Sequence, residues 1–176
     1  TFGAIFERLH LDNFPLLSVC VIRTWSGAVG SSDAAYRVLG FLIALLVLGA
    51  LLAHARSMGR AVTPWAGLLL FAANPVVLRA VESIRPYGIG VVLIVATHAL
   101  VWRATERPTG PRLIAAAGAA VLSVQTLYQN AILVAAICAS ASAVAMIRGR
   151  RSEAIAPLGI GLAAAASLVP YTGFIA

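Results

Sequence analysis

The sequence predicts an all-α, multi-pass transmembrane helical domain of about six spans, preceded by an outward-facing segment with interfacial helices. Two observations predict this fold. The chain is 61% hydrophobic and 11% charged, whereas soluble domains are about 45–50% apolar and about 25% charged. Its charges fall between long uncharged stretches, and a helix needs about 20 apolar residues to cross a bilayer. The net charge of +7 therefore indicates membrane topology rather than nucleic-acid binding.

Residues 1–35 are expected to form an outward loop with helices at the membrane surface. The first apolar stripe has helical spacing and consists of Phe2, Ile5, Phe6 and Leu9. Such a stripe is typical of a helix that lies in the membrane interface. The apolar run from Phe14 to Trp25 is interrupted by Arg23 and is too short to span comfortably, so it predicts a second surface or partly embedded helix. Plain membrane anchoring would also explain both helices.

Residues 36–176 are expected to form one transmembrane domain, as part of a larger one. The predicted spans are residues 36–55, 61–79, 87–104, 112–127, 130–147 and 154–172. The uncharged run from Leu113 to Ile147 is too long for one crossing and barely enough for two. We expect it to be a helical hairpin that turns near Leu127–Asn130, its most polar point.

Arginine clusters support this hairpin. They comprise Arg56 and Arg60, then Arg103, Arg107 and Arg112, then Arg148, Arg150 and Arg151. Arginine-rich loops favour the cytoplasmic side, and loops on the same side are separated by an even number of crossings.

Because all thirteen cationic side chains are arginine and alanine is abundant, we expect a GC-rich bacterial source and a plasma-membrane location.

Three polar segments are expected on the outward side. Their polar residues are His10, Asp12 and Asn13; Arg79, Glu82 and Arg85; and Gln125, Thr126, Tyr128, Gln129 and Asn130. Outward arginines run against the positive-inside tendency. They form either an ion pair with the glutamate at a wet loop or a site for an anion such as phosphate, which the planar guanidinium recognises well. Three such segments on one face predict a shared site.

The sequence shows no metal or nucleophile motif. Cys20 and Cys138 lie far apart without metal-type spacing, and His10, His54 and His98 form no ligand cluster. Serine-hydrolase, phosphate-loop and nucleic-acid modules are likewise not recognised. No cofactor is therefore established from the residues alone.

The order of motifs resembles membrane glycosyltransferases of the GT-C type, specifically the protein O-mannosyltransferase and aminoarabinose transferase-like enzymes. The matching elements, over about residues 9–135, are Asn13-Phe14-Pro15-Leu16, Trp25, Gly30, Arg37, Asn74-Pro75 and Glu82-Ser83-Ile84-Arg85-Pro86-Tyr87. Phe14 departs from the paired prolines of the family. Tyr128-Gln129-Asn130 occupies the place of a later outward tip but also departs from its usual sequence.

The resemblance implies transfer of a sugar from a polyprenyl-phosphate donor to a lipid, glycan or protein acceptor on the extracytoplasmic face. Arg85 would bind the donor phosphate, and Glu82 would hold Arg85 or contact a metal or the acceptor. The cavity lining implied by the resemblance is Asn13, Tyr87, Tyr128, Gln129 and Asn130. Some relatives use a divalent metal, although no ligand set here establishes one.

The catalytic aspartate implied by the family would lie upstream of Thr1, the first residue of this sequence. We expect the sequence to be a fragment that lacks the first span and that aspartate. Asp12 is a weak substitute, because it fits equally well as a helix cap before Pro15. Two other functions are open: a transporter or flippase with a polar pathway, and a non-catalytic membrane scaffold.

Overall fold

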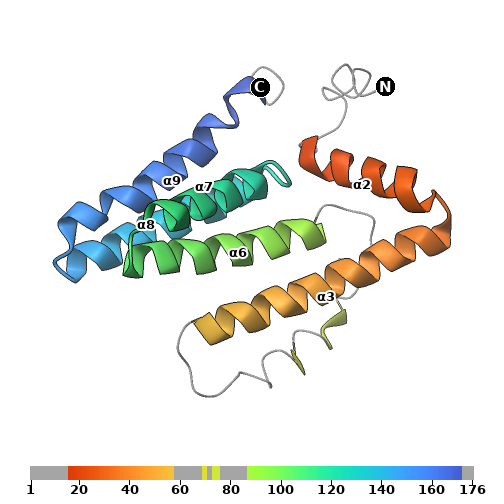
Figure 1. The fold of residues 1–176 in the computed structure, drawn as a ribbon, viewed down its shortest axis with the longest axis horizontal. Helices are drawn as coiled ribbons and strands as arrows, with labels where there is room; N and C mark the ends of the chain where they lie inside the picture. The colour runs from red at the N-terminus through yellow and green to blue at the C-terminus, as the bar shows by residue number, and fades with distance from the viewer. Residues whose placement is uncertain (1–15, 58–68, 71–72, 76–86, 172–176) are drawn as a thin grey trace.

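The computed structural model describes residues 16–57, 69–70, 73–75 and 87–171, and this part of the protein is all-helical (Figure 1). Its main helices are α2 (Leu16–Val29), α3 (Asp33–Ser57), α6 (Tyr87–Glu106), α7 (Gly110–Val124), α8 (Asn130–Ile147) and α9 (Ile155–Ala166). Short 3-10 turns, η1 (Arg151–Glu153) and η2 (Val169–Tyr171), flank α9. The predicted all-α class is confirmed, and a helix, α2, occurs near Phe14–Trp25 as expected.

Among the described residues, four segments are long and apolar enough to cross a membrane: Asp33–Arg56, Tyr87–Glu106, Asn130–Ile147 and Arg151–Tyr171. These agree with four of the predicted spans. The helix expected at 112–127 is shorter, because α7 has 15 residues and ends at Val124, a length of about 22 Å. The span expected at 61–79 lies mostly outside the described residues.

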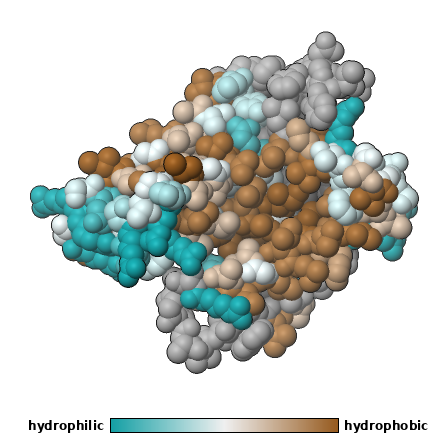
Figure 2. Space-filling view, viewed as in Figure 1, coloured by the Kyte–Doolittle hydropathy of each residue, from teal (hydrophilic) through white to brown (hydrophobic). Residues whose placement is uncertain are grey.

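Large apolar side chains cover the outside of these helices. Phe41 is 64% exposed, Leu46 59% and Ile132 75%. Figure 2 shows hydrophobic residues across the middle of the molecule and a hydrophilic region at its left end. An apolar exterior of this kind is energetically costly in water and is typical of a surface that faces lipid.

The helix termini follow from local sequence. Ser32 precedes α3 and its Oγ accepts a hydrogen bond from the Ala35 N–H at 3.2 Å, which caps the helix. Asp33 lies in the first turn of α3 and Arg56 in the last, as the helix dipole favours. Gly149 ends α8 with φ 75°, a left-handed conformation that costs glycine little.

The core between α6, α7, α8 and α9 is rich in alanine. It contains Val101, Ala104, Ala116, Ala120, Val124, Val134, Cys138, Ile160 and Ala164. Alanine-rich faces allow helix backbones to approach closely, which is how helices associate where lipid removes the hydrophobic driving force. The contact between α3 and α6 is also close, because a Cβ added at Gly88 would collide with Ile43 Cγ2.

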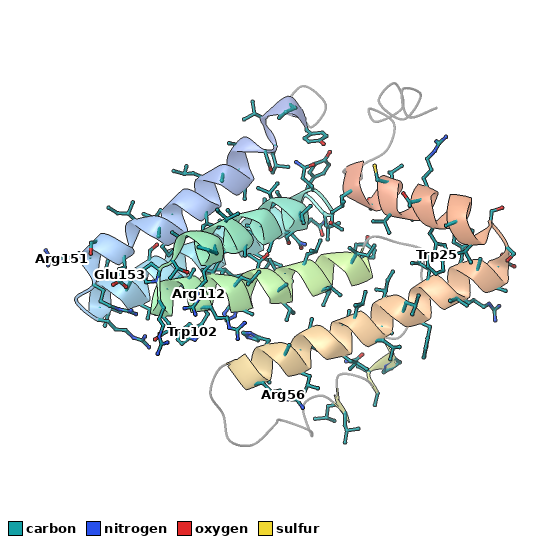
Figure 3. All side chains as sticks on the ribbon, viewed as in Figure 1. Trp25, Arg56, Trp102, Arg112, Arg151 and Glu153 are labelled. Carbon is teal, nitrogen blue, oxygen red and sulfur yellow. The ribbon has the colours of Figure 1, made fainter. Side chains whose placement is uncertain are left out.

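The helices place the arginines together. The chain reverses between α6 and α7, α7 and α8, and α8 and α9, while α3 and α6 run in the same direction (Figure 1). The C-termini of α3, α6 and α8 lie at one end of the bundle, here called the arginine-rich end. The arginines at this end are Arg56, Arg103, Arg107, Arg112, Arg148, Arg150 and Arg151. Figure 3 shows Arg56, Arg112 and Arg151 at this end and Trp25 on the other side. The opposite end contains the predicted hairpin turn between α7 and α8, which is confirmed.

Candidate functional site

The hairpin end is the candidate site. It is defined here by the 125–130 turn together with Tyr87, Ser167 and Tyr171. Of the residues predicted for the site, Tyr87, Tyr128, Gln129 and Asn130 lie in the described part of the chain.

Other residues predicted for the site lie outside the described part of the chain. They are Asp12, Asn13, Arg79, Glu82 and Arg85. The roles given to these residues therefore stay predictions.

Asn130 is deeply buried, with 4% of its surface exposed. Its Nδ2 donates hydrogen bonds to the Gly90 carbonyl at 3.2 Å, the Ser123 carbonyl at 3.3 Å and the Ser123 Oγ at 3.0 Å. These acceptors belong to α6 and α7. Because an amide NH₂ has two donors, three acceptors share them. Asn130 therefore ties the start of α8 to two other helices.

Gly90 permits this junction. A Cβ at position 90 would lie 3.3 Å from Asn130 Nδ2 and 3.7 Å from Leu127 Cβ. A larger side chain on α6 would push the turn away from its hydrogen-bond acceptor. The start of α6, with Tyr87 one turn before Gly90, is thus held against the α7–α8 turn.

Gln125 makes a second junction, to the end of α9. Its Nε2 donates to the Ser167 carbonyl at 2.8 Å and to the Ser167 Oγ at 3.3 Å. Its carbonyl accepts a hydrogen bond from the Leu17 N–H at 3.2 Å, which attaches the start of α2. Leu17 follows the first polar segment in the sequence, Tyr87 follows the second, and the 125–130 turn is the third. These described residues lie at one end of the bundle.

The two aromatic residues at this end form an edge contact. The rings of Tyr128 and Tyr171 are 5.8 Å apart between centroids. Burial raises the pKa of the Tyr128 phenol, and the neighbouring Tyr171 raises it further. Gln129 is exposed and Tyr87 is half-buried. Of the predicted lining residues that the structure describes, Gln129 is thus the most open to the surroundings, whereas Asn130 is buried between helices.

An apolar groove of about 370 Å³ lies below the hairpin end, between α8 and α9. Its walls include Val134, Cys138, Gly161, Leu162 and Ala165. It offers almost no polar atoms, so it suits a hydrocarbon chain rather than a sugar. No motif in the sequence predicts this groove.

The structure also brings together residues that sequence reasoning kept apart. The rings of His54 on α3 and His98 on α6 meet edge to face at 4.7 Å. No signal in the sequence predicts a pair 44 positions apart. Among the described residues, no group of three or more histidine, cysteine, aspartate or glutamate side chains could hold a metal ion.

Comparison of the chain with protein-family models, with curated proteins and with solved structures finds no match.

Proposed function

We propose that this chain is part of a GT-C-type glycosyltransferase. Such an enzyme moves a sugar from a polyprenyl-phosphate donor to an acceptor on the extracytoplasmic face. The observation that carries the proposal is that the starts of α2 and α6, which follow two of the polar segments in the sequence, both contact the 125–130 turn. Leu17 follows the Asn13-Phe14-Pro15-Leu16 motif, Tyr87 closes the Glu82–Tyr87 motif, and the 125–130 turn contacts both α2 and α6. The order of these motifs along the chain supports the same function.

The distribution of arginine supports the orientation. The arginine-rich end lies opposite the hairpin end, and arginine-rich loops prefer the cytoplasm. The hairpin end then faces outward, where polyprenyl-phosphate sugars are used by enzymes of this type. A donor with a phosphate at the membrane surface and a long isoprenoid chain needs an apolar path beside a polar site. The apolar groove between α8 and α9 supports the proposal, because its lining suits an isoprenoid chain.

In the proposed reaction the acceptor oxygen or nitrogen attacks the anomeric carbon, and the bond from that carbon to the phosphate oxygen breaks. Negative charge develops on the departing lipid phosphate, and Arg85 stabilises it through its fork of N–H donors. Glu82 orients Arg85 or contacts the acceptor. A carboxylate acting as general base removes the acceptor proton.

Arg85→Ala tests the proposal in the full-length protein supplied with polyprenyl-phosphate sugars. We expect sugar transfer to fall by about 100-fold or more, as removal of a group that stabilises developing charge usually does. Arg103→Ala is the matched control, because Arg103 is exposed at the opposite end. Equal transfer by wild type and Arg85→Ala would remove Arg85 from the mechanism.

A transporter is the second candidate, and one observation favours it. The His54–His98 contact places two ionisable rings between apolar helices, and polar groups inside a membrane often mark a substrate path. Flux of a lipid-linked or free sugar into proteoliposomes, without covalent transfer, would support this function. Flux that is unchanged in a His98→Leu variant would argue against the histidine pair as its pathway.

A further inference from the structure

Positive charge at the arginine-rich end exceeds the negative charge available to balance it. Among the described residues, seven arginines occur there with two glutamates, Glu106 and Glu153. Charge of one sign on neighbouring loops is mutually repulsive, and the repulsion is largest where lipid lowers the local dielectric. Part of this charge is therefore open to neutralisation by anions from outside the chain.

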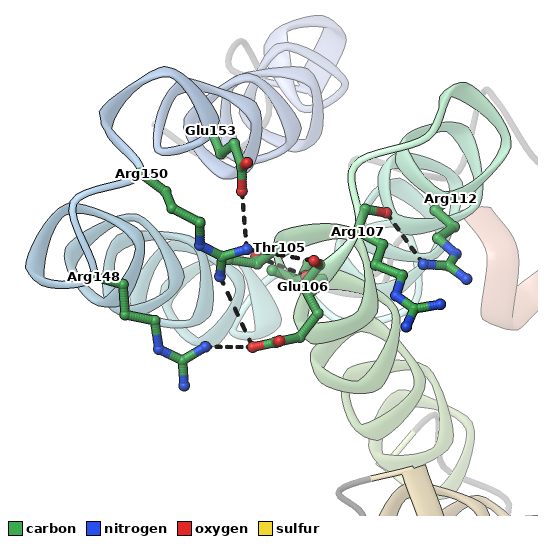
Figure 4. A network of polar contacts seen from close by, with 8 residues as sticks. Thr105, Glu106, Arg107, Arg112, Arg148, Arg150 and Glu153 are labelled. Carbon is green, nitrogen blue, oxygen red and sulfur yellow. Dashed lines mark hydrogen bonds and ion pairs between the residues drawn. The ribbon is translucent and has the colours of Figure 1, made fainter.

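Both carboxylates are already engaged on one side of this end (Figure 4). Glu106 forms an ion pair with Arg148 and lies 3.9 Å from Arg150. Arg150 also donates to the Glu106 carbonyl at 3.3 Å and pairs with Glu153 at 3.0 Å. The two acids thus pair with arginines that follow α8. The chain turns at the left-handed Gly149, between Arg148 and Arg150.

Arg107 and Arg112 lie on the other side of Glu106, at the corner between α6 and α7. Arg112 Nη1 donates to the Arg107 carbonyl at 3.2 Å, which draws the Arg112 side chain to this corner. Figure 4 shows the side chains of Arg107 and Arg112 on the side of Glu106 away from Arg148 and Arg150. Within the described residues, neither makes an ion pair with an acid.

The start of α7 adds to the positive character of this corner. The first turn of α7 contains no acidic residue, and Thr109 provides no side-chain cap. A helix N-terminus carries partial positive charge and normally attracts an acid. Here the first turn carries Arg112 instead. An anion bound at the corner would therefore reduce the repulsion between Arg107 and Arg112 and also the repulsion between Arg112 and the positive end of α7.

Apolar side chains next to the arginines indicate where such an anion comes from. Ile114 is 74% exposed, Ile147 85% and Ile155 70%, each within one or two turns of an arginine. Arg148 lies 5.5 Å from the ring centroid of Trp102, and tryptophan favours the boundary between lipid chains and water. These side chains indicate that the arginine-rich end, which includes this corner, lies where phospholipid headgroups meet their acyl chains.

We propose that Arg107 and Arg112 form a binding site for the phosphate of an anionic phospholipid. The two planar guanidinium groups bind the phosphate oxygens through paired N–H donors. The acyl chains of the lipid lie along the apolar face of α7, beginning at Ile114. This site is at the opposite end from the proposed transferase site and does not depend on it.

Lipid binding to the complete chain in neutral detergent tests the proposal, with bound lipids counted by native mass spectrometry during titration. We expect phosphatidylglycerol to bind more tightly than phosphatidylcholine. The double variant Arg107→Gln with Arg112→Gln should bind phosphatidylglycerol about thirtyfold more weakly, because each arginine near an anionic headgroup contributes about 1 kcal/mol. Arg23→Gln with Arg37→Gln removes the same charge elsewhere and should change the affinity less than about twofold.

Three outcomes would overturn the site. The first is equal phosphatidylglycerol affinity for wild type and the glutamine variant, and the second is an equal loss in the Arg23 and Arg37 control. The third is displacement of the lipid by millimolar inorganic phosphate, which would assign the corner to a free anion. Should the glutamine variant fail to fold, the double variant Arg107→Lys with Arg112→Lys replaces it in the titration. It keeps the charge but loses the paired donors, so unchanged affinity would contradict the proposal.

Discussion

The two ends of the helical bundle use polar residues in different ways. At the hairpin end, the amides of Gln125 and Asn130 are neutral and donate to oxygen atoms on other helices. At the arginine-rich end, Glu106 contacts Arg148 and Arg150 through side chains that remain substantially exposed. One end thus joins helices with buried hydrogen bonds, and the other joins them with ion pairs at the surface.

This difference has an energetic consequence. A buried donor that loses its partner costs about 1–3 kcal/mol, whereas an exposed ion pair contributes about 0–1 kcal/mol. The hairpin end should therefore determine how stably the helices pack. The arginine-rich end should determine orientation in the membrane and contact with headgroups, and it should tolerate substitution.

Asn130→Ala should have the largest effect on stability. The substitution removes all three hydrogen bonds from the Asn130 amide and leaves the Gly90 and Ser123 carbonyls without that donor. We expect the free energy of unfolding to fall by about 2–3 kcal/mol, measured by thermal or denaturant unfolding in detergent.

Gln129→Ala is the control for this experiment, because Gln129 is the exposed neighbour on the same turn. We expect it to change stability by less than about 0.5 kcal/mol. A stable Asn130→Ala protein that has lost the proposed sugar transfer would break the comparison, since Asn130 would then contact a substrate rather than stabilise the helix packing.

Much of the fold is predictable from the sequence because membrane helices are specified by composition. The uncharged runs and the arginines between them place α3, α6, α8 and α9, and the even number of crossings predicts the hairpin. The start of α3 at Asp33 rather than residue 36 reflects the Ser32 cap. The end of α7 at Val124 reflects the turn bonds from Thr126 and Leu127 to Ser123.

The candidate site is less predictable, because a polar residue at a turn can face either solvent or another helix. The sequence predicts Asn130 as a cavity-lining residue, yet its environment depends on Gly90, 40 positions away. The Gln125–Ser167 and His54–His98 pairs are similarly distant in sequence. Nothing in local periodicity encodes such contacts, which arise only when the helices pack.

Glu106→Gln should have a smaller effect than Asn130→Ala. It removes the charge that holds Arg148 and Arg150, but the side chains of Glu106 and Arg148 are 42% and 45% exposed. We expect a loss of about 0.5 kcal/mol or less at low salt, and no loss at about 1 M salt, where exposed charges are screened. Glu153→Gln, which removes a single pair with Arg150, should cost no more. A loss of about 2 kcal/mol from Glu106→Gln would contradict the distinction between the two ends.

Tyr128→Phe should have the smallest effect at neutral pH, and its effect should depend on pH in a specific direction. Burial raises the pKa of Tyr128, with a further contribution from Tyr171, while an unfolded tyrosine titrates at about 10. The unfolded state therefore loses its proton first, so this contribution to stability is fully present below about pH 10 and is lost as the pH rises through the folded pKa. Unfolding measured from about pH 8 to 11 should show a steeper alkaline loss for wild type than for Tyr128→Phe. Parallel curves would mean that Tyr128 reaches solvent freely, and the hairpin end would then be less tightly packed than its hydrogen bonds indicate.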